Sequence, residues 1–242
     1  MRISRFYYSD VITVDAEITL PDDLTHYISN VLRAKVGQPI VLFNGNGCDY
    51  PCEIIEAQKR KITVLVNSQI SLQVESPAEI HLAQCISKGD RMDYALQKAV
   101  ELGVSQISPI LSENCNVKLN DARWEKKVEQ WQKIVISACE QSGRNFVPHV
   151  NMPISFNQLL ATQTGMEKII LAPGATHYLS GVKKNSKGFL LTIGPEGGFT
   201  DQEVYNAQQR GFMCVNLGPR ILRTETATVV AMSILQSLHG DI

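Results

Sequence analysis

The 242-residue sequence lacks an excess of charge of either sign. It has 23 Lys and Arg against 24 Asp and Glu, a formal net charge of −1, and an isoelectric point of about 6.5. A protein without a global positive field does not attract nucleic acid over its whole surface. Any RNA or DNA site in this chain must therefore be a local basic patch.

Cysteine pairs and long apolar runs are also missing. The six cysteines include no Cys-x-x-Cys pair, and no histidine stands near Cys48 and Cys52 to complete a zinc site. We therefore expect no bound metal, and reduced thiols as in a cytosolic protein. No run approaches the roughly 18 apolar residues of a membrane span, and the first segment, MRISRFYYSD, has no signal-peptide core. The sequence predicts a cytoplasmic protein that contacts no membrane.

Strand patterns dominate the first third of the chain. Short apolar runs are found at residues 15–20, 38–43, 52–58 and 61–70, and NGNG at 44–47 is typical of a hairpin turn. One short helix is expected around residues 24–34. Several short strands in so short a segment predict a small β-barrel. The polar, proline-containing segment 71–79 then predicts a boundary, with domains at 1–72 and 73–242.

From residue 78 onward, apolar strands alternate with amphipathic helices. Strands are expected at 79–87, 104–112, 168–174, 188–194 and 212–218, and helices at 90–103, 121–143, 155–163, 201–210 and 224–238. Thr200 and Glu203 predict a capping box at the start of helix 201–210. This alternation predicts an α/β domain with a mainly parallel sheet.

Three strand ends of the second domain carry loops rich in glycine and proline. They are LAPG at 171–174, IGPEGGF at 193–199 and LGPRILRTETA at 217–227. Ligands bind at the carboxyl ends of parallel strands, where glycines let them approach the backbone. Turn chemistry explains any one of these loops, but three together favour a shared small-molecule pocket. None is a dinucleotide fingerprint, a Walker loop or a nucleophile elbow, so the pocket suits an adenine ring and ribose better than a triphosphate.

Five segments resemble the SPOUT-class 16S ribosomal RNA methyltransferases that methylate uracil at N3. They are RISRFYY, SKGDRMDYALQKAVELGVSQISPILSE, EQSGRNFVPHV, IGPEGGF and LGPRILRTETA, in order over almost the whole chain. The resemblance implies S-adenosylmethionine as methyl donor, and a PUA-like β-barrel before a SPOUT-type α/β domain. It also implies a C-terminal trefoil knot, which physical reasoning alone would reject because chains rarely thread loops. The implied partners are 16S ribosomal RNA of the small ribosomal subunit and a second copy of the chain.

The resemblance and the loop pattern together place the cofactor on the backbone of the three loops. The residues expected to bind it are Leu171, Ala172, Pro173, Ile193, Gly194, Pro195, Glu196, Gly197, Gly198, Leu217, Gly218, Ile221, Leu222, Arg223, Thr226 and Ala227. Helix 224–238 is expected to pack under this pocket through Val229, Val230, Met232, Ile234 and Leu235. Thr224 or Thr226 can cap this helix, and Glu225 suits its dipole.

Arg220 and Arg223 need another explanation, because cations at a helix N-terminus oppose the helix dipole. We expect each to meet a carboxylate or a phosphate. Methyl transfer to N3 of uracil needs alignment of the methyl carbon and loss of the N3 proton. Arg223 is the candidate for stabilising the uracil anion, unless it holds a phosphate of the target. Glu196 and Glu225 are the candidate general bases, although each also suits a structural role.

RNA contacts are expected from basic side chains in both domains. The candidates are Arg2, Arg5, Arg33, Lys88, Arg91, Lys98, Arg144 and Arg220. Contacts with phosphates supply salt-dependent affinity rather than base specificity, and a solvated surface charge is the simpler interpretation of any single one. Tyr7 and Tyr8 can stack on unpaired bases, but packing in a strand explains them equally well.

Two other functions and one assembly state follow from the same residues. A ribose 2′-O-methyltransferase would share the fold, although the early Asn-and-Arg motif of such enzymes is not found here. A non-catalytic RNA-binding factor would keep the fold without affinity for the cofactor. The apolar stripe of helix 121–141 and the apolar character of the last helix predict a homodimer.

Overall fold

The structure is a computed structural model that describes residues 3–115, 117, 120–184 and 187–242. Arg2, a predicted RNA contact, lies outside the described residues. The chain divides into two compact units. Unit 1 comprises residues 1–75 and 139–147, and unit 2 comprises residues 76–138 and 148–242.

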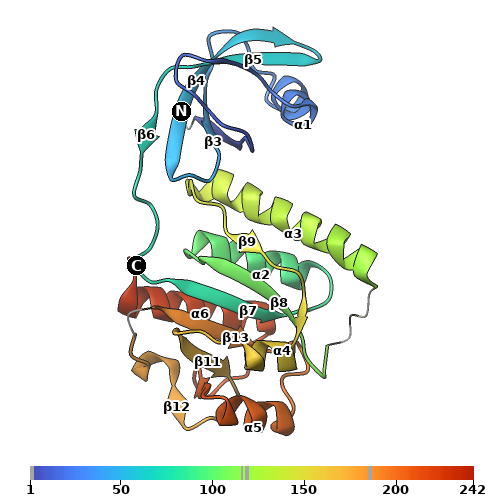
Figure 1. Ribbon diagram of the computed structural model, residues 1–242, viewed down its shortest axis with the longest axis vertical. Helices are drawn as coiled ribbons and strands as arrows, with labels where there is room; N and C mark the ends of the chain where they lie inside the picture. Colours follow the sequence, from blue (N-terminus) through green and yellow to red (C-terminus); the bar gives the residue numbers. More distant parts are fainter. Residues whose placement is uncertain (1–2, 116, 118–119, 185–186) are drawn as a thin grey trace. The chain divides into compact units, whose positions relative to one another are not determined.

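Unit 1 is built on a sheet with the strand order β1-β3-β4-β5-β2 (Figure 1). Its strands are β1 (Ser4–Tyr7), β2 (Glu17–Thr19), β3 (Pro39–Phe43), β4 (Cys48–Gln58), β5 (Lys61–Val66) and the short β6 (Ile70–Ser71), which pairs with β4. The antiparallel pair β3–β4 is joined by the predicted NGNG turn, where Gly45 and Gly47 both have positive φ. In the described part of the chain the strand order ends at β1 and β2 without the pairing that would close the predicted barrel.

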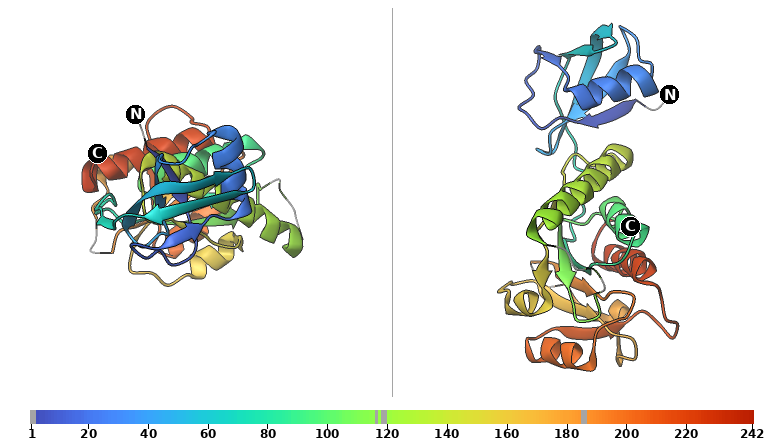
Figure 2. Two further views of the ribbon diagram at one scale, coloured as in Figure 1. Left: turned by 90° about the horizontal axis from the view of Figure 1, so that it is seen from above. Right: turned by 90° about the vertical axis from the view of Figure 1, so that its right-hand side faces the viewer.

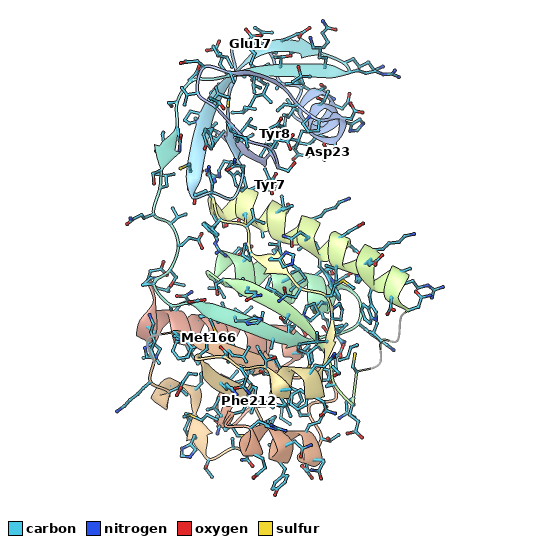
Figure 3. All side chains as sticks on the ribbon, viewed as in Figure 1. Tyr7, Tyr8, Glu17, Asp23, Met166 and Phe212 are labelled. Carbon is cyan, nitrogen blue, oxygen red and sulfur yellow. The ribbon has the colours of Figure 1, made fainter. Side chains whose placement is uncertain are left out.

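The core of unit 1 lies between this sheet and one short helical segment. The helix α1 (Asp22–His26) continues into a π-helical turn (Tyr27–Val31), as expected for residues 24–34. Ile28 from this segment is fully buried among Leu42, Ile54 and Val64 of the strands. Tyr8 packs against the same cluster, and the ring of Tyr7 meets Phe43 edge-on (Figure 3). Both tyrosines are therefore partly packed in unit 1.

Unit 2 contains an eight-stranded sheet in which every pair is parallel. The order is β10-β8-β7-β13-β11-β14-β12, and β9 pairs with β8. The strands are β7 (Ile80–Cys85), β8 (Gln106–Leu111), β9 (His149–Val150), β10 (Ile154–Ser155), β11 (Glu167–Leu171), β12 (His177–Tyr178), β13 (Phe189–Ile193) and β14 (Met213–Asn216). The predicted parallel sheet is confirmed; the two-residue strands β9, β10 and β12 carry too little pattern to be predicted.

Helices cover both faces of the sheet (Figure 2). They are α2 (Asp90–Glu101), α3 (Asp121–Ser142), α4 (Phe156–Ala161), α5 (Asp201–Gln209) and α6 (Thr224–His239), with a 3-10 turn at Leu179–Gly181. Helices α2 and α6 pack together on one face. Side chains of α4 and α5 meet Ala83 and Cys85 of β7 on the other, in a cluster that Met166 and Phe212 join (Figure 3). The capping box of Thr200 and Glu203 is present as predicted. No helix in the described part of the chain has the length and apolar character needed to cross a membrane.

Two expectations about apolar helix faces hold only in part. Met232 and Leu235 of α6 are buried as expected, but Val229, Val230 and Ile234 are only partly buried. The buried face of α6 instead includes Thr224, Thr228 and Gln236, which have hydrogen-bond partners inside the unit. The apolar stripe of α3, with Trp124, Trp131, Val135 and Ala138, is buried by the chain itself. These four side chains are therefore not available to a second copy, whereas Val128, Ile134 and Ile136 of the same helix are only partly buried.

Candidate functional site

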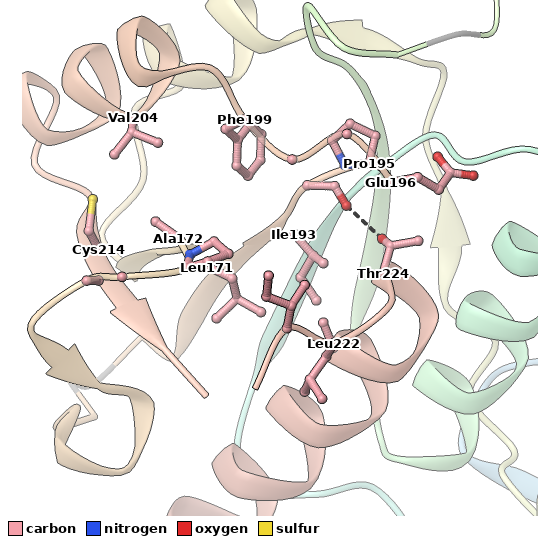
Figure 4. A pocket seen from close by; sticks show the side chains of 18 of the residues that line it. Leu171, Ala172, Ile193, Pro195, Glu196, Phe199, Val204, Cys214, Leu222 and Thr224 are labelled. Atoms are coloured by element: carbon pink, nitrogen blue, oxygen red, sulfur yellow. Dashed lines mark hydrogen bonds between the residues drawn. The ribbon is translucent and has the colours of Figure 1, made fainter. Parts of the chain in front are cut away.

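A cavity of about 800 Å³ lies at the carboxyl ends of β11 and β13 in unit 2 (Figure 4). Its walls come from all three predicted loops and from one face of α5. A second cavity of about 520 Å³ shares Leu171, Leu222 and Ala227 with the first and extends along residues 215–220. The structure therefore brings the three loops together around two neighbouring cavities with shared walls.

Most of the residues predicted to bind a cofactor line these cavities. The larger cavity is lined by Leu171, Ala172, Pro173, Ile193, Gly194, Pro195, Glu196, Gly197, Gly198, Ile221, Leu222, Arg223 and Ala227, and the smaller one by Leu217 and Gly218. Thr226 lines neither cavity, because its side chain is on the exposed face of α6. Gly198 has a φ of +67° and space where a side chain would stand, so its backbone is open to a ligand.

Sequence reasoning missed the wall that α5 contributes. Val204, Tyr205 and Gln208 line the larger cavity, as does Cys214 of β14. Val204 and Gln208 are four residues apart and so share one face of the helix. The signal was present in the sequence, because the capping box fixes where α5 begins after the glycine loop 194–198.

Thr224 joins the start of α6 to this glycine loop. Its hydroxyl donates a hydrogen bond to the carbonyl oxygen of Gly194 across 2.6 Å (Figure 4). The prediction that Thr224 or Thr226 caps α6 is wrong, since the N-cap residue is Arg223 and no side chain accepts from the first turn. The Thr224 hydroxyl points inward because it has a buried carbonyl to satisfy.

Asn114, which follows β8, holds the far end of the same loop. Its Nδ2 donates to the carbonyl oxygens of Gly197 and Gly198 across 3.2 and 3.1 Å. A Cβ at Gly197 would stand 3.1 Å from the Cβ of Asn114, which is closer than most such contacts, so a larger residue would displace Asn114 by a few tenths of an ångström. The glycine loop is therefore fixed at both ends by side chains outside it.

Glu196, in the middle of the loop, is held by the start of α2. Its Oε1 accepts from Arg91 Nη1 across 2.8 Å and from the backbone N–H of Lys88 across 3.0 Å. Burial raises the pKa of Glu196, but hydrogen bonds from its own backbone N–H and that of Lys88, together with the charge of Arg91, outweigh this and lower the pKa below its usual value. A carboxylate with a lowered pKa is a weaker proton acceptor.

Two charged side chains, those of Arg223 and Glu225, also belong to the cavity wall. Arg223 lines the cavity, and within the described residues neither Arg223 nor Arg220 has an ion-pair partner, so the expected carboxylate is absent there. Glu225 Oε2 is buried in the cavity wall with no hydrogen-bond partner in the same residues. A buried carboxylate oxygen without a donor is costly, which is typical of a site that awaits a ligand.

The predicted RNA contacts divide into exposed and buried side chains. Arg5 is ion-paired with the buried carboxylate of Asp49, and Arg144 donates from Nε to Glu75 across 3.0 Å. Arg144 is buried, Arg5 is largely buried, and both are ion-paired within unit 1, which argues against a role for either as an RNA contact. Lys98 is paired with Glu101 on α2. The exposed candidates are Arg33, Lys88, Arg91 and Arg220.

Comparisons with known proteins cover both units. Residues 74–236 match the model of an RNA methyltransferase domain, and residues 20–67 match that of an RNA methyltransferase PUA domain. Two curated relatives named ribosomal RNA small subunit methyltransferase E come from Buchnera aphidicola subsp. Schizaphis graminum and Bacillus subtilis. They are 38% and 35% identical to this chain, covering 100% and 89% of it and 98% and 90% of their own lengths.

Solved structures agree with this similarity. A ribosomal RNA small subunit methyltransferase E from Neisseria gonorrhoeae, bound to S-adenosylmethionine, is 40% identical, with a TM-score of 0.94 over 100% of both chains. A putative methyltransferase from Legionella pneumophila, in complex with the same cofactor, is 37% identical, with a TM-score of 0.96 over 100% of both chains. The similarity therefore extends over the full length of the fold.

Proposed function

The chain belongs to the ribosomal RNA small subunit methyltransferase E family of RNA methyltransferases, and we propose that it methylates N3 of a uridine in 16S ribosomal RNA with S-adenosylmethionine as donor. The observation that carries the proposal is the cavity at the carboxyl ends of β11 and β13, whose wall includes Arg223, a cation with no ion-pair partner in the described part of the chain. With a ribosomal substrate, we expect the protein to work in the cytoplasm.

The residues around the cavity fit the proposed cofactor. Its volume of about 800 Å³ is within the range of small-molecule sites, and apolar side chains and backbone form most of its wall. We infer that Leu171, Gly194, Gly198 and Leu222 hold the nucleoside, and that residues 217–218 extend the site into the smaller cavity. When bound, the cofactor supplies a methyl carbon on a positively charged sulfur.

Arg223 and Glu225 are the residues that we assign to the reacting base. Loss of the N3 proton leaves negative charge on the two carbonyl oxygens of uracil, which a guanidinium can stabilise. Arg223 is exposed at the cavity and unpaired among the described residues, so it is free to act on that charge. Glu225 has an unpartnered oxygen in the same wall and suits proton acceptance better than Glu196, which Arg91 already holds.

The fold supports two further parts of the proposal, a SPOUT-type knot and a homodimer. After β12 at one edge of the sheet, the chain returns to β13 at the centre, runs out to β14 and comes back in α6 beside α2. A trefoil knot requires such returns together with passage of the C-terminal segment through an earlier loop. For the homodimer, α6 offers the partly buried Val229, Val230 and Ile234, and Ile221 is 89% exposed beside the cavity.

The remaining cationic side chains suit the RNA backbone. We assign Arg33 in unit 1, and Lys88 and Arg220 in unit 2, to phosphate contacts, because all three are exposed and form no ion pair among the described residues. Arg91 is also exposed, but it is already paired with Glu196. These contacts would supply affinity, while the cavity selects the base.

The test is the chemical position of the transferred methyl group. Unmodified small ribosomal subunits are incubated with the protein and isotopically labelled S-adenosylmethionine, and the RNA is digested to nucleosides for mass spectrometry. We expect label in 3-methyluridine. Label on a ribose would indicate a 2′-O-methyltransferase. RNA binding without label or cofactor affinity would indicate a non-catalytic factor.

A further inference from the structure

A chain of buried hydrogen bonds connects the centre of the unit 2 sheet to the cavity. Thr228 of α6 donates to Gln84 Oε1 across 2.7 Å, and Gln84 Nε2 donates to the Thr224 hydroxyl across 3.0 Å. Thr224 in turn donates to the carbonyl oxygen of Gly194 across 2.6 Å. Gln84 and Thr228 are fully buried and Thr224 is nearly so, hence water cannot replace any member of this chain.

The direction of these bonds is fixed by the number of protons available. A threonine hydroxyl has one proton, and Thr224 gives it to Gly194, so Thr224 must accept from Gln84. The second amide proton of Gln84 goes to the carbonyl of Cys85 across 3.2 Å. Turning the amide of Gln84 over would place its oxygen against that carbonyl. Only one arrangement therefore satisfies every buried group.

Packing of the sheet core does not by itself explain why a fully buried position carries the amide of Gln84. Gln84 lies on β7, a central strand, beside Ile193 of β13 in the sheet register. Burying a primary amide stabilises a fold less than burying an apolar side chain of the same size, unless all its hydrogen bonds form. The hydrogen bonds of Gln84 reach α6 directly and reach the glycine loop through Thr224. Arg223 stands at the start of α6, and both elements line the cavity.

We propose that Gln84 is a positioning residue that fixes Arg223 and the glycine loop relative to each other for methyl transfer, an inference that rests on the proposed function. Arg223 immediately precedes Thr224 in the chain. The hydrogen bond from Gln84 to the Thr224 hydroxyl therefore fixes the backbone from which the Arg223 side chain extends. Gln84 lines neither cavity, so its influence on the site passes through its hydrogen bonds to Thr224 and Thr228 on α6. Small displacements of an aligned group cost large factors in rate, which makes this network a determinant of rate rather than of binding.

The test compares two buried glutamines that hold opposite ends of α6. Gln84→Met removes the amide near the cavity at nearly constant volume. Gln236→Met is the matched control, because Gln236 is also fully buried and is bonded to Leu102 and Ser76, away from the cavity. At saturating RNA and cofactor, we expect Gln84→Met to lower the single-turnover rate about tenfold to 100-fold, and Gln236→Met to keep the rate. Equal rates per folded molecule in the two variants would overturn the inference.

Amide hydrogen exchange gives a readout that needs no reaction. Gln84→Met should speed exchange at the N–H of Ala227, bonded to Arg223 O across 2.8 Å, and at that of Gly198, bonded to Pro195 O across 2.9 Å. Gln236→Met should instead affect Gly240, bonded to Gln236 O. Unchanged exchange at Ala227 and Gly198 would overturn the inference. Were the wild-type protein to methylate no RNA, the proposed function would fail, while exchange would still decide whether Gln84 fixes this turn.

Thr228 supplies a second variant if Gln84→Met does not fold. Thr228→Val removes the hydroxyl that donates to Gln84 Oε1 and that also lies 3.0 Å from the carbonyl oxygen of Thr224, and Thr228 lines neither cavity. It should slow the single-turnover rate in the same direction, and Thr228→Ser, which keeps the hydroxyl, should restore it. A Thr228→Val rate equal to that of Thr228→Ser would contradict the positioning role.

Discussion

Arg91 donates a hydrogen bond from Nη1 to Glu196 Oε1 across 2.8 Å, so the first turn of α2 holds the middle of the glycine loop. The backbone N–H of Lys88 reaches the same oxygen across 3.0 Å. This arrangement gives Glu196 a structural role. It also leaves Glu225 as the carboxylate with an unpartnered oxygen in the cavity wall.

The first prediction separates the structural role of Glu196 from catalysis. Glu196→Gln keeps an oxygen for the Lys88 N–H but removes the charge that pairs with Arg91. We expect the single-turnover rate to stay within about fivefold of wild type, whereas loss of a general base costs about 10²–10⁴-fold. Glu225→Gln should show the larger loss. A 100-fold slower Glu196→Gln variant with an unaffected Glu225→Gln variant would reverse the assignment.

The ion pair of Glu196 also predicts a dependence of stability on pH. Since folding lowers the pKa of Glu196, its contribution to stability is complete above the ordinary value of 4.5 and is lost as pH falls through the lower folded value. Thermal unfolding of wild type and Glu196→Gln should therefore differ near pH 7 and converge at the acid end. A difference in unfolding midpoint that grows as pH falls below 4.5 would contradict this.

The second prediction concerns the cofactor site. Ala227 lines both cavities from the first turns of α6, and its neighbour Thr226 lines neither. Ala227→Leu should fill part of the site and weaken S-adenosylmethionine binding at least about tenfold, since leucine suits a helix nearly as well as alanine. Thr226→Leu is the control on the same turn. Calorimetry showing equal cofactor affinity in both variants would exclude this cavity. Gly198 is less suitable for substitution, because its φ of +67° would strain any β-branched side chain.

The third prediction distinguishes a structural arginine from an RNA contact in unit 1. Arg5→Met leaves the carboxylate of Asp49 buried without its cation, so the free energy of unfolding should fall by about 3–5 kcal/mol. Arg33→Ala removes an exposed side chain and should change stability by less than about 0.5 kcal/mol. Arg33→Ala should instead reduce RNA affinity and the slope of its salt dependence. Denaturant unfolding and salt titrations check both variants, and an Arg5→Met protein as stable as wild type would refute the burial argument.

The fourth prediction concerns assembly. If the partly buried Val230 and Ile234 of α6 face a second copy, the wild-type protein is a dimer at micromolar concentration, and glutamate at both positions should shift it towards monomer. Ser237→Glu, at an exposed position on the same helix, should leave the dimer intact. Light scattering measures all three proteins. A monomeric wild-type protein would contradict the proposed dimer.

Much of the fold is predictable from local pattern, because each element carries its own signal. NGNG specifies the β3–β4 turn, and the Thr200–Glu203 capping box specifies the start of α5. The run FLLTI predicts β13 as a strand buried on both faces, whereas β7 is predicted from a mostly apolar run that includes His81 and Gln84. The three glycine loops are likewise predictable as neighbours, because all follow parallel strands.

The contacts that act across the sheet are not predictable in this way. Nothing near Gln84 in the sequence indicates that it meets Thr224 and Thr228, and nothing near Asn114 indicates that it holds Gly197. For the same reason, the local sequence pattern predicts Thr224 as a helix cap and Arg5 as an RNA contact. In each case a partner from a distant segment, Gly194 or Asp49, outweighs the local preference.

Single-turnover methylation by Arg223→Lys at saturating RNA and cofactor tests the catalytic role of Arg223 most directly. Lysine keeps the charge but loses the planar fork that can span two oxygens of the uracil anion. Saturation removes differences in binding, so the measured rate reports the chemical step. Arg210→Lys, an exposed arginine outside both cavities, is the matched control. We predict a rate about 100-fold below wild type for Arg223→Lys and an unchanged rate for Arg210→Lys; a near-normal rate for Arg223→Lys would contradict the catalytic role of Arg223.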